Sequence, residues 1–345
     1  MNAPCPSPPA TPRLLLAPME GMLDPRLRAV LTHAAAYDWC VTEFVRVSQE
    51  VLPARAFLRL APELKTGSRT ASGVPLRVQL LGSDPERMAA NAARLLQLEP
   101  AGIDLNFGCP APQVNRHRGG AVLLDEPELL YAITHAVGAA IAGRTRYSAK
   151  MRLGVHDKSR AVEAAQALEA GGAELLVVHA RTRDERYLPP AHWEWVARIA
   201  DAVRIPVVAN GEIWTVDDYQ RCRAVSGCQD VMLGRGAVAD PLLVARIRGR
   251  LAGAPDEPYA DGWRRLAPLL LDYWQRVLAD LDPRHGPGRI KQWVNLLRRH
   301  YPQAEALFQE FRELREAAPL GDCLARHVAQ AVAAQARSGA TSAAG

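Results

Sequence analysis

The sequence predicts a (β/α)8 barrel followed by an all-helical C-terminal domain. Eight short aliphatic runs recur along the first 250 residues, and most of them are too apolar for half-exposed antiparallel strands. The segments between them, such as Pro85–Leu98 and Arg160–Ala170, are long enough for helical crossovers. Eight strand–helix repeats within about 240 residues agree with a (β/α)8 barrel. The runs are Leu14–Ala17, Cys40–Val45, Leu76–Leu81, Ile103–Asn106, Tyr147–Met151, Leu175–His179, Val207–Asn210 and Val231–Leu233.

A doubly wound α/β sheet is the structural alternative. Such a sheet would place a GxGxxG turn between its first strand and first helix, and none is present. Gly171-Gly172 follows a helical segment in the usual C-terminal position, which agrees with a regular strand–helix alternation. The barrel is therefore the preferred prediction.

Beyond residue 250 the strand pattern stops, and Gly253-Ala254-Pro255 indicates a linker. We expect a disordered Pro-rich N-terminus over 1–12, a barrel over 13–250, a separate helical domain over 260–336 and a disordered tail over 337–345. The expected helices are Trp263–Leu278, Arg289–Tyr301, Ala304–Ala317 and Asp322–Ala336. In the second of them, Ile290, Val294, Leu297 and Tyr301 share one face at helical spacing, and Lys291, Asn295 and Arg298 share another.

The composition excludes several classes of protein. The chain is 48% apolar and 23% charged, as globular proteins are. The N-terminus lacks the features of a signal peptide, and no run approaches the roughly 20 apolar residues needed to cross a bilayer. The six cysteines form no CxxC pair, so we expect no disulfide framework, no metal site and a reducing compartment, the cytoplasm.

The net charge of +5 permits a polyanionic partner without requiring one. Lys65, Lys150, Lys158 and Lys291 are the only lysines, and the other cations are arginines. Arginine suits bidentate contacts to phosphate, although a codon bias would produce the same excess. Under either interpretation, a position that carries lysine departs from the preference of this chain for arginine.

Polar and glycine-rich groups gather where the predicted strands end, which is where barrel enzymes hold their reacting groups. They include Ala17–Gly21, Gln79, Asn106–Pro110, Lys150, Arg152, His179–Arg181, Asn210–Glu212 and Gly234–Gly236. Individually, Lys150 fits a structural ion pair, His179 a core histidine and Glu212 a turn residue. Their joint placement on one rim, with glycines after the last two strands, indicates a site for an anionic cofactor.

These motifs resemble those of the tRNA-dihydrouridine synthases. The similar segments are Leu16–Gly21 with Thr42–Arg46, Asp104–Pro110, Ser148–Gly154, Val178–Thr182, Val208–Ile213 and Gly234–Ala237. Glu43–Arg46, Asn210–Trp214 and Arg289–Trp293 are most similar to the bacterial C-type enzymes, which act on uridine 16 of the D-loop. The loop Asn115–Gly120 departs from the C-type pattern, because it carries Arg116 and Arg118. Another D-loop uridine, at position 20 or 20a, is the alternative target.

The resemblance implies FMN as cofactor, NADPH as reductant and tRNA as substrate. Pro18, Met19, Glu20 and Gln79 would contact the flavin ring, Lys150 its N1/O2 edge, and His179 would help to hold it. The flavin phosphate would lie against Asn210, Gly211, Glu212, Gly234 and Arg235. Asn106 would contact the uracil or the flavin edge. The helical domain over 260–336 would bind tRNA, and the implied tRNA contacts are Arg46, Tyr187, Arg289, Lys291, Arg298 and Arg299.

Cys109 is the expected proton donor. In the implied reaction, hydride passes from N5 of reduced FMN to C6 of the uracil, and C5 needs a proton from the opposite face. A free thiol has a pKa near 8.5, so it is mostly protonated at neutral pH and is able to act as an acid. A small buried packing residue is the structural alternative for Cys109.

Two other functions compete with this prediction. A flavin barrel reductase of free pyrimidines would share the barrel but would need no basic helix. A non-catalytic RNA-binding protein would need only the helical domain, and the cysteine loop argues against it. We expect a monomer without a membrane partner.

Overall fold

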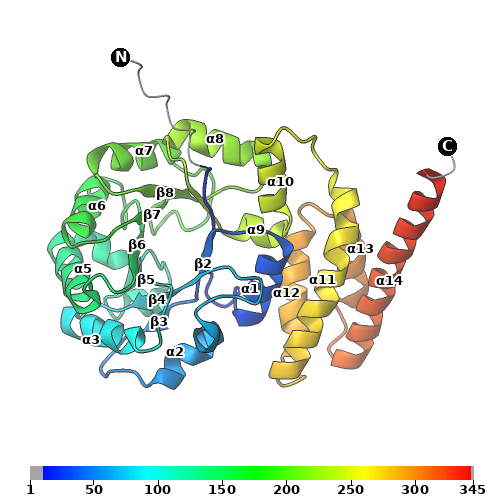
Figure 1. Ribbon diagram of the computed structural model, residues 1–345, viewed down its shortest axis with the longest axis horizontal. Helices are drawn as coiled ribbons and strands as arrows, with labels where there is room; N and C mark the ends of the chain where they lie inside the picture. Colours follow the sequence, from blue (N-terminus) through cyan, green and yellow to red (C-terminus); the bar gives the residue numbers. More distant parts are fainter. Residues whose placement is uncertain (1–10, 343–345) are drawn as a thin grey trace, which may run out of the picture.

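The computed structural model describes residues 11–342, with side chains as far as residue 333. Most of the predicted disordered N-terminus, residues 1–10, lies outside the described residues, as do residues 343–345. Figure 1 shows a ring of strands enclosed by helices, with a group of long helices beside it.

The strands form one closed parallel sheet in the order β2-β1-β9-β8-β7-β6-β5-β4-β3, with β2 also paired to β4. Their bounds are β1 Leu14–Leu16, β2 Trp39–Val41, β3 Val45–Arg46, β4 Leu76–Leu81, β5 Gly102–Phe107, β6 Arg146–Arg152, β7 Leu176–His179, β8 Val207–Asn210 and β9 Val231–Leu233. Every neighbouring pair in the ring is parallel, so all carboxyl ends meet at one rim.

The run Cys40–Val45, predicted as one strand, is divided into β2 and β3. Both pair with β4, through Cys40 with Leu76 and Val45 with Leu80. At the interruption, the Thr42 hydroxyl accepts the backbone N–H of Gln79 at 3.0 Å, so a side chain replaces the backbone acceptor there. The two short strands fill a single position of the ring, and the predicted eight-position barrel is confirmed.

Helices cover the outside of the ring (Figure 1). They are α1 Pro25–Ala34, α2 Ala54–Leu60, α3 Pro85–Leu96, α4 Pro112–Asn115, α5 Pro127–Ile141, α6 Ala161–Ala170, α7 Trp193–Ala202, α8 Val216–Ser226, α9 Arg235–Ala239 and α10 Leu243–Leu251, with 3-10 turns at Pro62–Thr66 and Gly120–Asp125. As predicted, α6 ends at the glycine pair, where Gly172 has a φ of +101°, in the left-handed region that favours glycine.

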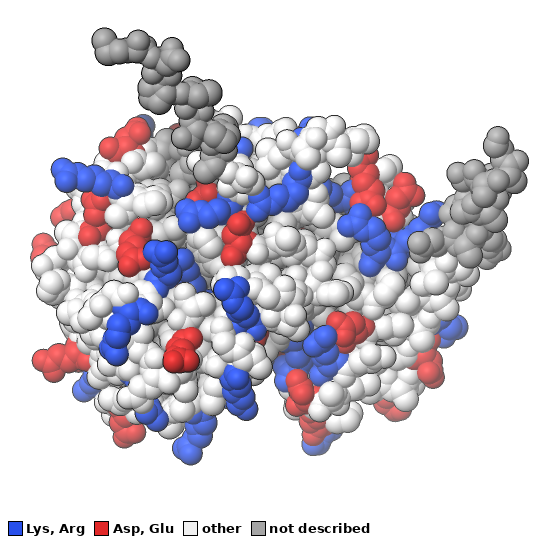
Figure 2. All heavy atoms as spheres, viewed as in Figure 1, with Lys and Arg blue, Asp and Glu red and all other residues white. Residues whose placement is uncertain are grey.

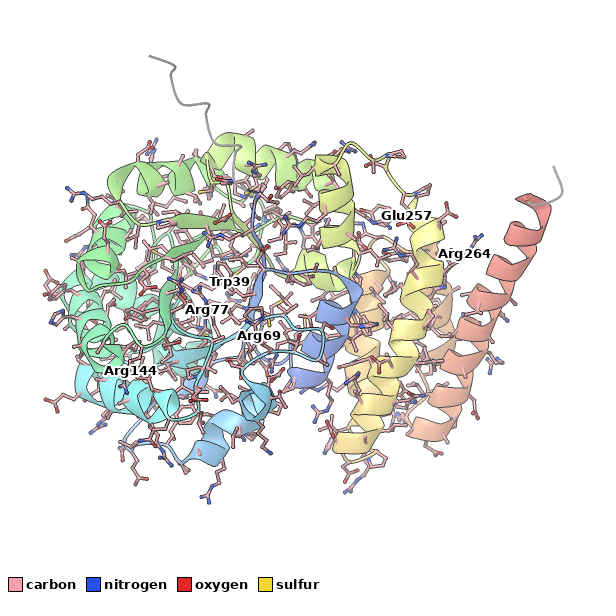
Figure 3. All side chains as sticks on the ribbon, in the orientation of Figure 1. Trp39, Arg69, Arg77, Arg144, Glu257 and Arg264 are labelled. Atoms are coloured by element: carbon pink, nitrogen blue, oxygen red, sulfur yellow. The ribbon has the colours of Figure 1, made fainter. Side chains whose placement is uncertain are left out.

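The amino-terminal end of the barrel interior is filled. Trp39 lies in this small core, between the guanidinium groups of Arg13 and Arg77, whose carbons are 5.2 and 4.3 Å from the ring centroid. Figure 3 shows Trp39 and Arg77 together near the centre of the ring of strands. The rest of this core is Leu15, Ala17, Val41, Leu175, Val177, Val208 and Met232. The barrel interior is therefore filled at this end, and Ala17 and Met232 also line the cavity at the opposite rim.

The C-terminal region consists of α11 Tyr259–Asp280, α12 Gly286–Leu297, α13 Pro302–Phe311 and α14 Ala317–Ser342. It lies beside the barrel along α1 and α9 (Figure 1). The apolar face predicted for α12, with Tyr301 beyond its end, is fully buried. Trp293 of this helix donates to the carbonyl of Val238 in α9 at 3.1 Å, which fixes the helical region to the β9 side of the rim.

The last helix, α14, runs to Ser342, so it includes residues 337–342 of the segment expected to be a disordered tail. The expected domain bounds remain a prediction. Alanine is the strongest helix former, and an alanine-rich stretch precedes residue 337, so the helix extends into the small polar residues that follow.

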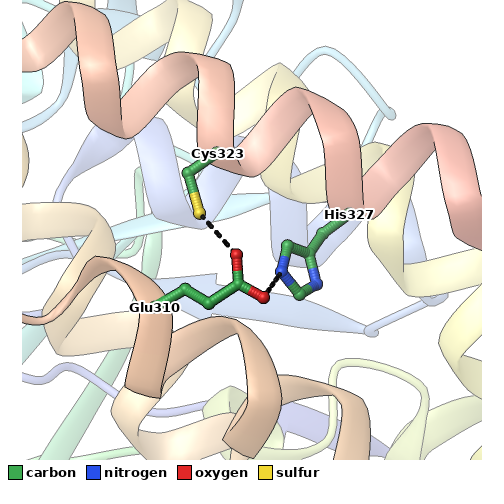
Figure 4. Close-up of side chains that lie close together, drawn as sticks. All are labelled: Glu310, Cys323 and His327. Carbon is green, nitrogen blue, oxygen red and sulfur yellow. Dashed lines mark hydrogen bonds and ion pairs between the residues drawn. The ribbon is translucent and has the colours of Figure 1, made fainter.

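A polar cluster joins α13 to α14 (Figure 4). Glu310 of α13 contacts His327 Nε2 at 2.9 Å and accepts from the Cys323 thiol at 3.6 Å, and both of these residues lie on α14. These side-chain types bind metals. The guanidinium of Arg326, however, lies 3.2 Å from the same carboxylate and already neutralises it. We therefore interpret the cluster as a polar contact between two helices.

Candidate active site

A cavity of about 600 Å³ opens at the carboxyl ends of the strands. Every residue predicted to be catalytic or to bind the cofactor lines it, together with two of the predicted substrate contacts, Asn106 and Tyr187. These residues are Pro18, Met19, Glu20, Gln79, Asn106, Cys109, Lys150, His179, Tyr187, Asn210, Gly211, Glu212, Gly234 and Arg235. Arg46 lines a neighbouring cavity of about 320 Å³ instead.

The loop that carries Cys109 is held from the end of β5. The Asn106 side-chain oxygen accepts the backbone N–H groups of Gly108 at 3.0 Å and Cys109 at 2.9 Å. Its amide nitrogen donates to the Gln79 side-chain oxygen at 2.7 Å. Asn106, predicted to contact the uracil or flavin, thus already has a positioning role for the cysteine.

The same hydrogen bonds continue into the barrel interior. Gln79 donates to the Asp104 carboxylate at 2.7 Å, and Ser148 donates to its other oxygen at 2.6 Å. Burial raises the pKa of Asp104, whereas these two hydrogen bonds oppose that shift. Three neighbouring strands therefore hold Asn106, and through it the backbone of Cys109.

Arg152 fixes the Cys109 loop from its other side. This buried side chain of β6 donates to the carbonyl of Gly108 at 2.8 Å, and also to those of Thr182 and Arg186 in the loop after β7, at 3.0 and 2.8 Å. From the sequence, Arg152 was placed on the rim but was not predicted as a site residue, although an arginine at the end of a buried apolar strand is a usable signal.

The Cys109 thiol is half-buried and holds its proton. Burial raises its pKa, and the negative charge of Glu20 adds to the shift. Burial, followed by repulsion from Glu43, also raises the pKa of Glu20 to about 7. A thiol with a raised pKa is neutral at physiological pH, as the predicted role of Cys109 requires.

The wall of the cavity formed by β6 and β7 carries basic side chains. Lys150 donates to the Asn210 side chain at 2.9 Å and has no carboxylate partner among the described residues. Burial and then repulsion from Arg152 lower the pKa of Lys150 to about 7. The same causes, with burial first, lower the pKa of His179 well below its ordinary value. This wall therefore favours an anionic ligand.

The loop after β8 passes close to His179. Gly211 has a φ of +115°, and a β-carbon there would lie 2.9 Å from the His179 ring. The carboxylate of Glu212 pairs with the buried Arg181 and accepts from Trp214 Nε1. Its side chain is thus already engaged, and its backbone remains for the predicted cofactor contact.

Aromatic rings and arginines line the edge of the cavity near the helical region. The Arg235 guanidinium lies 4.6 Å from the Tyr187 ring and 5.1 Å from the Trp214 ring. The guanidinium of Arg299, just beyond α12, lies 4.0 Å from the centre of the same Trp214 ring. Arg299 thereby links the helical region to the rim without a carboxylate partner among the described residues.

The other basic residues predicted on α12 have partners inside the protein. Lys291 donates to the carbonyl of Arg312 at 2.8 Å, and Arg298 pairs with Glu305 of α13. Arg289 donates to the carbonyl of Gly21 at 2.9 Å. Figure 2 shows basic and acidic side chains interspersed on the face in view, with no large patch of one sign.

These features define an enzyme of the (β/α)8 class, with a protonated thiol and a cationic wall facing one cavity. The family model for dihydrouridine synthases matches residues 15–334. The tRNA-dihydrouridine(16) synthase of Ralstonia nicotianae is 56% identical over 89% of this chain and 94% of its own length. That of Aquipseudomonas alcaligenes is 53% identical over 91% and 99%. The chain belongs to the dihydrouridine synthase family and is an oxidoreductase.

A solved structure of 2-naphthoyl-CoA reductase has the same fold. Its TM-score is 0.54 at 11% identity, covering 70% of this chain and 50% of that one. Among the described residues, no helix is both long and apolar enough to cross a membrane.

Proposed function

We propose that this protein reduces a uridine of tRNA, at position 16 of the D-loop, to 5,6-dihydrouridine, with FMN as cofactor and NADPH as reductant. The observation that carries the proposal is the Cys109 thiol, held protonated at the edge of a cavity with a cationic wall. The relatives that match nearly the whole chain are named for the same position of tRNA.

The cavity fits an anionic flavin. Its volume of about 600 Å³ lies within the range for cofactor sites. Lys150, lacking a carboxylate partner, would meet the negative charge of the ring, and the backbone of Gly234 and Arg235 would meet the phosphate. When bound, the flavin supplies the hydride that goes to C6 of the uracil.

The protein's own contribution to the chemistry is the proton. Cys109 Sγ would donate it to C5 of the ring and would then be reprotonated. Asn106 and Arg152 hold the loop, so the thiol keeps its position while the substrate changes shape.

Flavin binding should depend on pH through Lys150. Because the pKa of this lysine is about 7 in the empty site and an anion raises it, binding above pH 7 requires uptake of a proton. The affinity for FMN, followed by fluorescence quenching, should therefore weaken as the pH rises above about 7. The FMN phosphate does not cause this change, because its second pKa is near 6 and it is already ionised. Lys150→Met should remove this dependence. A slope unchanged in that variant would contradict the assignment.

Arg299 should contribute to tRNA binding, unlike its neighbour Arg298. Arg299 has no carboxylate partner among the described residues, whereas Arg298 pairs with Glu305. Arg299→Ala should weaken tRNA binding and reduce the slope of log affinity against log salt by about 1. Arg298→Ala is the matched control, since it should lower thermal stability and leave the slope unchanged. Equal slopes for both variants would exclude Arg299 as a phosphate contact.

One experiment tests the whole proposal. Mass mapping of tRNA from a strain that lacks the gene, with and without a plasmid copy, should show the gain of two hydrogens at uridine 16 only with the plasmid. A gain at position 20 or 20a would correct the target. Turnover with free uridine as efficient as with tRNA would favour a reductase of small pyrimidines.

A further inference from the structure

Leu188, in the loop after β7, exposes 71% of its surface, the largest fraction among the large hydrophobic side chains of the described residues. Its neighbour Tyr187 is 49% exposed. Adjacent exposed apolar side chains on a folded protein are typical of interaction sites.

The backbone that carries Leu188 is firmly held. The buried Arg181 donates to the carbonyl of Leu188 at 2.7 Å, and the Leu188 N–H donates to the carbonyl of Glu185 at 3.0 Å. Arg152 holds the carbonyl of Arg186 two residues earlier. Two buried arginines thus fix the backbone of a loop whose apolar side chain points into solvent. A loop that only joined β7 to the next helix would not need such support.

The position of the loop indicates what Leu188 meets. Tyr187 and Arg186 line the same cavity as Cys109, and the Arg186 side chain has no ion pair or hydrogen bond within the described part of the chain. Arg186 and Tyr187 thus lie at the cavity as an unpaired cation and an aromatic ring, and the exposed Leu188 follows them directly in the chain. A cation suits a phosphate, a ring suits a base, and nucleic acid offers both.

We propose that Leu188 is a wedge that enters the D-loop and fills the place in the base stack that the target uridine leaves. The proposal rests on the proposed function. A base in a folded loop must leave its stack to reach the cavity, and proteins that unstack bases frequently insert an apolar side chain. Arg186 would hold a flanking phosphate, and the fixed backbone would keep the wedge aligned with the cavity.

The test compares a folded substrate with an unfolded one. Leu188→Ser should lower turnover on full-length tRNA by about tenfold or more, because the cost of unstacking is no longer offset. On a short unstructured RNA that contains the same uridine, turnover should change by less than about threefold. Leu188→Met keeps an apolar side chain and should restore most of the loss. Leu278→Ser, at a 39% exposed position on α11, is the matched control.

A second readout follows the base itself. A tRNA with 2-aminopurine beside the target should become more fluorescent on binding to the wild-type protein, and much less so on binding to Leu188→Ser.

Equal losses on both RNAs, or wild-type behaviour of Leu188→Ser, would overturn the wedge. A dimer that this substitution dissociates would do so as well, since Leu188 would then be a subunit contact. If the wild-type protein does not reduce tRNA, the proposed function itself fails. If the wild-type protein and Leu188→Ser reduce tRNA equally well, the wedge fails and the proposed function stands.

Discussion

Replacement of Cys109 by alanine should lower the formation of dihydrouridine in tRNA by roughly 10²–10⁴-fold, the usual contribution of a general acid. The variant should retain its flavin, because the substitution leaves the basic side chains of β6 and β7 unchanged, and it should still oxidise NADPH. Quantification of dihydrouridine in digested tRNA, beside the absorbance spectrum of the protein, measures both properties. Cys222→Ala is the control, because that cysteine is buried in α8 and does not line the cavity.

The dependence of product formation on pH is a second measurement of the proposed acid role of Cys109. The acid must be protonated to act, and burial raises the pKa of the Cys109 thiol. Product formation by the flavin-loaded enzyme should therefore persist through neutral pH and decline only above the ordinary thiol value of about 8.5. Near-normal product formation by Cys109→Ala, or a decline well below that pH, would remove the acid role.

Replacement of Gly236 by alanine should have the second large effect. Gly236 is buried in α9, and a β-carbon there would overlap the carbonyl oxygen of Ile213 and lie 3.0 Å from its carbon. The neighbour is backbone and cannot rotate away, so the loops after β8 and β9 must separate. We expect a loss of about 1–3 kcal/mol in the free energy of unfolding. Flavin affinity should fall by about tenfold or more, since these loops form the proposed phosphate site.

The control is another glycine of the same chain. Gly288 lies in α12 at an exposed position, and a β-carbon there meets nothing within 4 Å. Gly288→Ala should stabilise the protein by up to about 1 kcal/mol and leave flavin binding unchanged. If Gly236→Ala bound FMN as tightly as wild type, the phosphate site would have to lie elsewhere.

Much of the cavity was predictable from the sequence, because parallel strands bring their carboxyl ends to one rim. Once the strands ending near Gln79, Lys150 and Asn210 are recognised, the polar residues at those ends must converge. The register that fixes their neighbours was not predictable. Ser148 and Asp104 meet across β6 and β5, and nothing in the spacing of 44 residues between them indicates it.

The basic face of α12 shows a different limit. Helical periodicity placed Lys291 and Arg298 on one face, and the structure agrees with that spacing. Periodicity says nothing about which helix will cover the face. Here α13 supplies Glu305, and Arg312, just after the end of α13, supplies its carbonyl. The interruption between β2 and β3 was hidden for a similar reason, since it depends on the Thr42 hydroxyl meeting Gln79 of another strand.

The attachment of Cys109 to the barrel interior has a consequence for how this enzyme can diverge. The backbone of Cys109 is set by Asn106 and, through it, by Gln79 and Asp104, all of them on β4 and β5. Arg116 and Arg118 lie further along the loop and take no part in that chain of hydrogen bonds. If the proposed function holds, substitutions at Arg116 and Arg118 should alter which uridine is preferred and leave the Cys109 thiol in place. Substrate preference and the proposed acid would then be able to change separately.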